Sequence, residues 1–333
     1  MKKPGKFLIG FISLILFFLL IALPFYVSTY LLHILILLFV WSAITVAWSY
    51  MGRFGLLSLG HGAVLGIGVY TTTLLFNFYR LSPWIGMFIA ALLAVIFFAG
   101  IGYFCFRFGV IGHYFAITTL VETMVIYLLI INFRDYTGGS LGLTVHPLGT
   151  APLYFQFDHK MYFYFFALAF FLLTLYIWKK IDHSSVKKAM TAIENDEVAA
   201  SSVGITIWKY KTIVTAISAF MTVIGGVIYT QYMMSLQPDT TASVDVSLTL
   251  SFKAILGGMY SLWGPLIGNI LIIGLEEYFR VAYGAKFISW AMAAYGVIIV
   301  VLIIFFPKGL HGTLSEWLTK KRLSQHRTAP VIK

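Results

Sequence analysis

Residues 84–106 read WIGMFIAALLAVIFFAGIGYFCF and contain no aspartate, glutamate, lysine or arginine. An apolar run of about 20 residues is long enough to cross the hydrocarbon core of a bilayer as a helix. Similar runs recur along the whole chain of 333 residues, of which 60% are hydrophobic and 11% charged. Soluble domains carry about 25% charged residues, and barrel strands alternate polar and apolar residues. The continuous runs therefore predict an all-α, polytopic membrane protein.

Ten such segments are the candidate spans of this membrane protein. They cover residues 7–27, 31–50, 56–76, 84–106, 113–132, 161–178, 211–234, 246–260, 262–280 and 287–306. The first is long for the apolar part of a signal peptide and has no clear small-residue cleavage site after it, so we expect a retained first helix. The eighth is short for a span and carries Lys253, but charge placement favours counting it as a crossing.

The basic residues predict the orientation of these spans. With ten crossings and the N-terminus inside, one of the 23 lysines and arginines lies in the membrane and only five lie outside. Those five are Arg80, Arg134, Lys160, Arg280 and Lys286. An excess of basic residues in cytoplasmic loops is typical of membrane proteins, so we assign the net charge of +11 to these loops and expect no nucleic-acid partner. The expected domains are a transmembrane domain over 1–319 and a basic cytoplasmic tail over 320–333.

Glycine is clustered in two places, Gly52–Gly68 and Gly257–Gly268. Glycines in membrane helices allow close packing, whereas paired interruptions in the two halves of a transporter often mark its pathway. The clusters lie in opposite halves of the chain, which leaves open an inverted repeat. The residues that we expect beside a pathway are Ser58, Gly60, His61, Gly62, Glu122, Gly257 and Gly258.

Two titratable residues in this set have alternative interpretations. Glu122 lies deep inside a span, where a carboxylate is costly and often functional; a structural hydrogen bond and an ion pair with Lys253 are the alternatives. His61 either faces the pathway or is a hydrogen-bonded packing residue. No catalytic set accompanies them, because the eight histidines are scattered and no phosphate-binding G-x-x-x-x-G-K-[ST] motif is present. We therefore expect a protein that is not an enzyme and has no cofactor or metal.

Residues 179–208 form the only long polar, charge-rich segment of the chain. Read as a helix, this segment gathers small apolar residues on one stripe and ends at Gly204, a plausible C-cap. The stripe consists of Val186, Ala189, Met190, Ile193 and Ala200, with Glu197 among them. A helix that binds a membrane surface combines lysines and arginines with bulky apolar residues, so this pattern favours docking into a protein groove. Packing on the membrane surface or on the protein's own loops are the alternatives.

The stretch Ala192–Ile205 resembles the coupling loop of permeases from bacterial branched-chain amino acid ABC importers, the LivM-type subunit. Further stretches resemble the same family in its own order. They are Leu57–Tyr70, Gly112–Leu120 followed by Glu122, Thr137–Leu143, Leu256–Pro265 and Phe306–Leu310. The family's loop reads Glu-Ala-Ala-x-x-x-Gly; Ala199, Ala200 and Gly204 match it, but Val198 stands where the family has glutamate. Lys253 also stands where we expect an apolar residue.

The resemblance implies the permease fold and mechanism of an ABC importer. Two permease subunits, expected as a heterodimer in the lipid bilayer, would form the pathway, two cytoplasmic ATPase subunits would hydrolyse ATP, and an extracytoplasmic binding protein would deliver the substrate. The location would be the bacterial inner membrane, with both termini cytoplasmic. The residues expected to dock the ATPase are Ala189, Met190, Ile193, Glu194, Glu197, Ala199, Ala200 and Gly204. The alternatives are an ion-coupled secondary transporter and an ABC permease for urea or short amides.

Overall fold

Six helices in the part of the chain that the structure describes are long and apolar enough to cross a membrane. The computed structural model describes residues 18–283, 296–297, 300–301, 304–305 and 309–313. The six are α2 (Thr29–Gly52), α3 (His61–Tyr79), α4 (Pro83–Arg107), α5 (His113–Asn132), α7 (Lys160–Asp182) and α10 (Ile207–Met233). These helices confirm the prediction of an all-α, multi-pass membrane protein.

Two further helices, α12 (Val244–Gly257) and α13 (Gly264–Tyr283), occupy the positions of the expected eighth and ninth spans. α12 is shorter than a full span, and α13 carries three charged residues near its end, Glu276, Glu277 and Arg280. The expected first and last spans, 7–27 and 287–306, lie largely outside the described residues, as does the tail 320–333. The number of ten crossings and the domain boundary therefore stay predictions.

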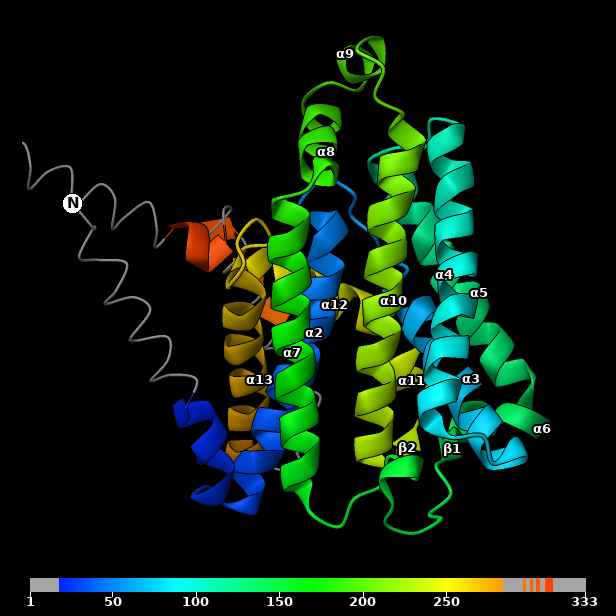
Figure 1. The fold of residues 1–333 in the computed structure, drawn as a ribbon, viewed down its shortest axis with the longest axis vertical. Coiled ribbons are helices and arrows are strands. Elements are labelled where there is room, and N and C mark those ends of the chain that lie inside the picture. Colours follow the sequence, from blue (N-terminus) through cyan, green and yellow to red (C-terminus); the bar gives the residue numbers. More distant parts are fainter. Residues whose placement is uncertain (1–17, 284–295, 298–299, 302–303, 306–308, 314–333) are drawn as a thin grey trace, which may run out of the picture.

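The short elements gather at the two ends of the helix bundle (Figure 1). α8 (Ser185–Asn195) and α9 (Glu197–Ser202) project from one end, which we call the α8–α9 end. At the opposite end, β1 (Leu143–Thr144) pairs antiparallel with β2 (Ser235–Leu236), so we call it the β1–β2 end. The other short elements are η1 (Leu23–Phe25), α6 (Arg134–Thr137), η2 (Gly139–Leu141), η3 (Pro152–Tyr154) and α11 (Pro238–Thr241).

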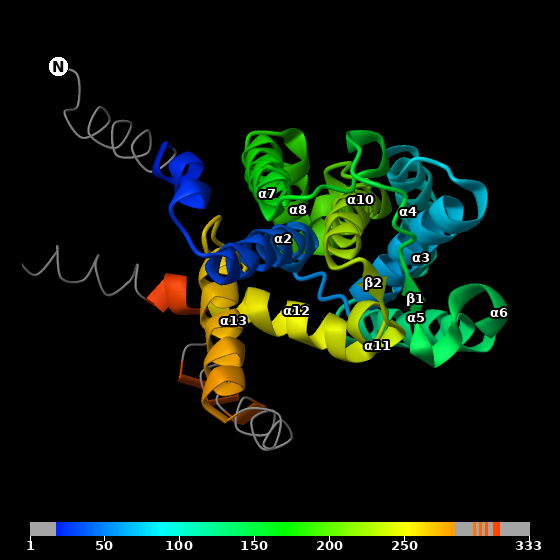
Figure 2. The ribbon, with the colours of Figure 1, turned by 90° about the horizontal axis from the view of Figure 1, so that it is seen from below.

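The long helices stand in two rows, seen along their length in Figure 2. α7, α10 and α4 form one row, α13, α12 and α5 form the other, and α2 and α3 lie between them. Small residues bring the inner helices close together: a Cβ atom on Gly225 of α10 would lie 2.5 Å from Ile44 of α2 and 3.0 Å from Phe170 of α7. Close approach of this kind is how helices associate without a hydrophobic driving force in lipid.

The helices differ in how much of their surface the chain itself covers. The most apolar window of α3 is 61% buried, whereas that of α5 is only 28% buried. Exposed side chains on α5 include Ile117, Val121 and Leu128. The outer face of α5 is therefore apolar and is free to contact lipid or another membrane subunit.

Candidate functional site

The chain between α2 and α3 turns back among the helices without forming a helix. Residues 53–60 carry no regular helix, and α3 begins at His61 rather than near residue 56 as the sequence predicted. The indole Nε1 of Trp48 donates a hydrogen bond of 2.9 Å to the Ser58 carbonyl, so Ser58 lies beside the last turns of α2. Non-helical backbone at membrane depth is tolerated only where protein buries it or where it lines a cavity.

Side chains of α5 and α12 hold this re-entrant segment by its backbone. Thr119 accepts a hydrogen bond from the Leu59 amide at 3.0 Å, and Thr123 donates one to the Leu59 carbonyl at 2.7 Å. From α12, Ser251 donates to the Ser58 carbonyl at 3.5 Å, and Ser247 accepts from the amide of Gly62, in the first turn of α3, at 2.7 Å. Our sequence analysis missed these hydroxyl residues, although a threonine or serine pair one turn apart on an apolar helix is a signal that could have found them.

His61 is a fully buried residue at the start of α3. Its Nε2 lies 2.9 Å from the hydroxyl of Ser218 on α10, which donates to the Ala47 carbonyl of α2 at 2.7 Å. The ring lies edge-on to Phe98, with centroids 5.5 Å apart. These contacts agree with the packing interpretation: His61 joins α2, α3 and α10 through a short chain of hydrogen bonds.

Glu122 lies on α5 directly beside the re-entrant segment. A Cβ atom on Gly60 would lie 3.4 Å from its Oε2 and 3.1 Å from Thr119. Both carboxylate oxygens are buried, and neither has a hydrogen-bond partner among the residues that the structure describes. Neither a structural hydrogen bond nor an ion pair with Lys253 is present among the described residues, and both stay hypotheses. Ser58, Gly60, His61, Gly62 and Glu122 form one buried cluster, which we call the polar cluster.

Gly257 and Gly258 lie apart from the polar cluster. They end α12 against the first turns of α13, where a Cβ atom on Gly257 would overlap the Gly264 carbonyl. Gly258 has a φ of +109°, which side-chain-bearing residues rarely adopt. The same helix α12 carries Ser247 toward the polar cluster, so one helix connects this glycine pair with the polar cluster.

No three histidine, cysteine or acidic side chains gather closely enough to hold a metal ion in the described part of the chain.

The polar segment 179–208 forms two helices where the sequence predicted one. Asp196 interrupts it with an extended backbone, and its carboxylate accepts hydrogen bonds from the amides of Val198 and Ala199 at 2.8 and 3.0 Å. Aspartate at this position is a strong N-cap, so α9 starts anew. Gly204 ends α9 with a φ of +86°, and the Ile205 amide bonds the Ala200 carbonyl at 3.1 Å. The predicted C-cap is thereby confirmed.

The apolar stripe of this segment packs against the chain itself. Ala189, Met190, Ile193 and Ala200 are buried, with Met190 fully enclosed. Three of them, Met190, Ile193 and Ala200, join a core cluster with Phe54, Phe106 and Val214, because the ends of α2, α4 and α10 supply an apolar surface for the stripe. The expectation that these four side chains enter a groove on a partner is corrected here: they hold α8 and α9 onto the bundle.

Ion pairs fix the same element to two long helices. Glu197 of α9 pairs with the buried Lys211 of α10. Asp182 at the end of α7 pairs with Arg53 at 2.8 Å and with Lys187 of α8 at 3.2 Å. Arg53 is the first residue after α2, so this network links α8 to the start of the re-entrant segment.

The remaining surface of α9 is open. Val198 is 81% exposed and Val203 is 76% exposed, and Ala199 and Gly204 are exposed beside them. Of the eight residues that we expected to dock a partner, three are exposed and can reach one: Glu194, Ala199 and Gly204. We call Val198, Ala199, Val203 and Gly204 the α9 tip.

A family model for the branched-chain amino acid transport system / permease component matches residues 26–306. The chain belongs to this family. The match covers both the polar cluster and the α9 tip of this permease, so both are parts of the family's domain. The family is described as the permease component of a transport system.

Individual relatives agree with the family model. The high-affinity branched-chain amino acid transport system permease proteins LivM of Escherichia coli K12 and Salmonella typhimurium LT2 are 27% and 26% identical to this permease over 285 residues. These alignments cover 78% of the chain and 64% of each relative. The ribose import permease protein RbsC of Haemophilus influenzae is 26% identical over 99 residues, which are 28% of this chain and 31% of that protein. No solved structure matches the chain.

Proposed function

We propose that this chain is the membrane permease subunit of an ATP-driven importer for branched-chain or related amino acids. The observation that carries the proposal is the family match over residues 26–306, supported by two relatives named as branched-chain amino acid permeases. Those relatives are longer than this chain, which spans 64% of their length, so substrate and partners are inferred from the shared part.

The α8–α9 end faces the cytoplasm in this proposal. Arg53, Arg107, Lys179 and Lys187 belong to helix ends or loops on that side, whereas Arg80, Arg134 and Lys160 belong to the other side. This asymmetry supports an inner-membrane protein with basic loops inside. The chain crosses ten times, with both termini cytoplasmic.

The partners follow from the surfaces that the chain leaves open. A second permease subunit completes the pathway in the membrane, and the apolar outer face of α5 is one surface available for it. Two cytoplasmic ATPase subunits dock at the α9 tips of the two permeases, with Glu194 at the edge. An extracytoplasmic binding protein delivers the substrate at the β1–β2 end.

The contacts of α9 provide a route from ATP hydrolysis to the membrane. Closure of the ATPases moves α8 and α9 together, because buried side chains of both helices belong to one core cluster. The Glu197–Lys211 pair transmits the movement to α10, and Ser218 of α10 is hydrogen-bonded to His61. Rigid-body movements of packed helices are a common way to alternate between two states.

The test is co-purification of the ATPase subunits with variants of the α9 tip. Val198→Asp and Val203→Asp each place a charge on an exposed apolar contact and should reduce ATPase recovery and substrate-stimulated ATP turnover at least about tenfold, as loss of an interface anchor does. Leu141→Asp is the matched control for ATPase recovery, since Leu141 is 77% exposed at the opposite end. Full ATPase recovery with both valine variants would overturn the docking surface, and absence of any ATPase with the wild-type chain would favour an ion-coupled transporter.

A further inference from the structure

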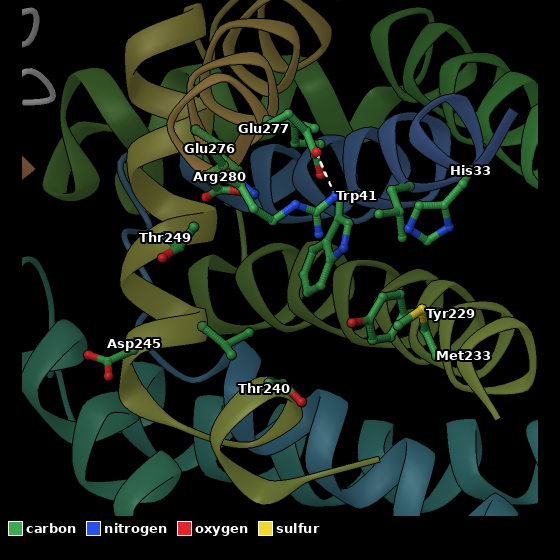
Figure 3. Close-up of a pocket in the computed structure, with 14 residues that line it drawn as sticks. His33, Trp41, Tyr229, Met233, Thr240, Asp245, Thr249, Glu276, Glu277 and Arg280 are labelled. Carbon is green, nitrogen blue, oxygen red and sulfur yellow. Dashed lines mark hydrogen bonds and ion pairs between the residues drawn. The ribbon is translucent and has the colours of Figure 1, made fainter. Parts of the chain in front are cut away.

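A cavity of about 480 Å³ lies between α2, α10, α12 and α13, away from the polar cluster and toward the β1–β2 end. Figure 3 shows its lining side chains. On α2 and α10 they are spaced four residues apart, so they share one face of each helix. His33, Leu37 and Trp41 come from α2, and Tyr229 and Met233 come from α10. Cavities that bind small molecules have volumes of about 300–1,000 Å³, so this one is large enough for a single small solute.

Lys253 of α12 is the buried cation of this cavity. The residue is only 5% exposed, and its Nζ lies 5.3 Å from the centre of the Trp41 ring. Its ammonium has three hydrogen-bond donors but makes no hydrogen bond or ion pair with the residues that the structure describes. A charge inside a membrane protein is costly unless it is paired, and a cation–π contact offsets only part of that cost. The site is therefore suited to an anionic group.

Glu276 of α13 brings an opposite charge to the same cavity. Its neighbour Glu277 is already engaged, because it accepts hydrogen bonds from Tyr30 at 2.9 Å and from Arg280 at 2.6 Å. Glu276 is exposed and makes no such hydrogen bond in the described part of the chain, and it attracts Lys253 electrostatically without forming a direct ion pair. The buried cation of Lys253 thus shares one cavity with the carboxylates of Glu276 and Asp245, an arrangement that suits a zwitterion better than a simple anion.

The cavity also has apolar and aromatic walls, beside the polar His33, Thr240 and Thr249. Leu37, Val246 and Ile273 supply aliphatic surface. Trp41 stands edge-on to Tyr229, with ring centroids 5.2 Å apart, and closes one side. An aliphatic side chain placed against these groups would bury apolar surface on both partners.

We infer that this cavity binds a zwitterionic α-amino acid with an aliphatic side chain. The carboxylate is held by Lys253, the ammonium group by Glu276, and the side chain by Trp41 and the aliphatic wall. The choice of an amino acid rests on the proposed function; the site and the role of Lys253 as its specificity-determining residue rest on the cavity. This site lies within one chain, between its own helices.

The first test changes the ligand and leaves the protein intact. The full chain in phosphatidylcholine nanodiscs is titrated with L-leucine, with leucinol, which lacks the carboxylate, and with 4-methylpentanoate, which lacks the ammonium group. Binding is measured by saturation-transfer NMR. We expect each truncated ligand to bind at least about tenfold more weakly than leucine, because each leaves one cavity charge unpaired. Equal binding of leucine and leucinol would overturn the inference.

The second test changes the protein. Lys253→Met should weaken leucine binding at least about tenfold and leave leucinol binding unchanged, whereas Lys253→Arg should keep most of the leucine affinity. Glu276→Gln should weaken leucine but not 4-methylpentanoate. Lys209→Met is the matched control, since Lys209 is an exposed lysine outside the cavity. Unchanged leucine binding by Lys253→Met would overturn the role of Lys253.

The two proposals fail separately. If wild-type chain binds no leucine while ATPase subunits still co-purify, the cavity inference is overturned and the proposed function stands. If ATPase association also fails, the proposed function is overturned with it. If Lys253→Met does not fold, the ligand comparison on the wild-type chain still decides the first question.

Discussion

The two glycine clusters of this permease look alike in sequence but contact different parts of the chain. Glycines of the first cluster mostly face side chains: Gly68 of α3 meets Val223 of α10, and Gly66 meets Ala242. Glycines of the second cluster face backbone, since a Cβ atom on Gly257 would overlap the Gly264 carbonyl and one on Gly268 would overlap the Lys253 carbonyl. A side chain can be shortened or can change rotamer, but a helix carbonyl cannot.

The difference indicates what each cluster contributes. In the second cluster, α12 and α13 touch backbone to backbone, so their relative position is set rigidly. In the first cluster, α3 is spaced from α10 by side chains, and the re-entrant segment is held by hydroxyl groups. We therefore expect the tolerance to added methyl groups to rise from the second cluster to the first.

The largest effect is expected for Gly268→Ala. The new Cβ would overlap the Lys253 carbonyl, so α12 and α13 must separate, and we expect a loss of about 3 kcal/mol or more. The measurement is the thermal unfolding midpoint of the purified chain in detergent, together with the yield of monodisperse protein. A midpoint equal to that of the wild type would show that the two helices are not packed by backbone contact.

An intermediate effect is expected for Gly62→Ala. Its Cβ would lie 2.5 Å from the Ser243 carbonyl and 2.9 Å from both the Ser247 hydroxyl and the Thr123 methyl group, so one backbone and two side-chain atoms obstruct it. We expect a loss of about 1–3 kcal/mol and reduced uptake. Adding Ser247→Ala should recover only part of the lost stability, because the Ser243 carbonyl remains. Complete recovery would show that side chains, not backbone, limit the space at Gly62.

The smallest loss is expected for Gly68→Ala. The three atoms nearest to the new methyl group would all belong to Val223, the first at 2.7 Å, and we expect a cost of about 1 kcal/mol. The double variant Gly68→Ala with Val223→Ala exchanges volume across the same contact and should recover most of the stability. Gly100→Ala is the control, since no atom lies within 4 Å of its added Cβ. Failure of the double variant to recover would mean that backbone limits this contact too.

The helices themselves were largely predictable from hydropathy. The expected span 113–132 coincides with α5, and the expected eighth and ninth spans contain most of α12 and α13. Hydropathy did not predict the break before His61, because hydroxyl groups from α5 and α12 hold the backbone of Ser58 and Leu59 outside a helix. Hydrophobic periodicity predicts which residues can form a helix. It does not show which side chains, distant in sequence, hydrogen-bond to the backbone and keep a segment non-helical.

The candidate site was predictable only in part. The sequence predicted Ser58, Gly60, His61, Gly62 and Glu122 beside a pathway together with Gly257 and Gly258. The structure brings the first five into one cluster, and their place beside a pathway stays a prediction. The polar segment 179–208 was also predictable from the sequence. A stripe of small apolar residues, however, does not reveal whether a partner protein or the chain itself covers the stripe. Asp196 divides that segment because its capping bonds outweigh continuation of the helix, a local competition that helical periodicity does not register.

The hydroxyl groups that hold the re-entrant segment also set an order of assembly during synthesis. The Gly62 amide bonds to Ser247, which is made 185 residues later. At about 5–20 residues per second, a ribosome needs roughly 10–40 s to make that stretch. During this interval the nascent chain already has α2 and α3 but not the serine that accepts from Gly62. The junction of the re-entrant segment with α3 therefore becomes complete only when the second half of the chain has entered the membrane. In a chain truncated after α10, the Gly62 amide would lack its Ser247 acceptor.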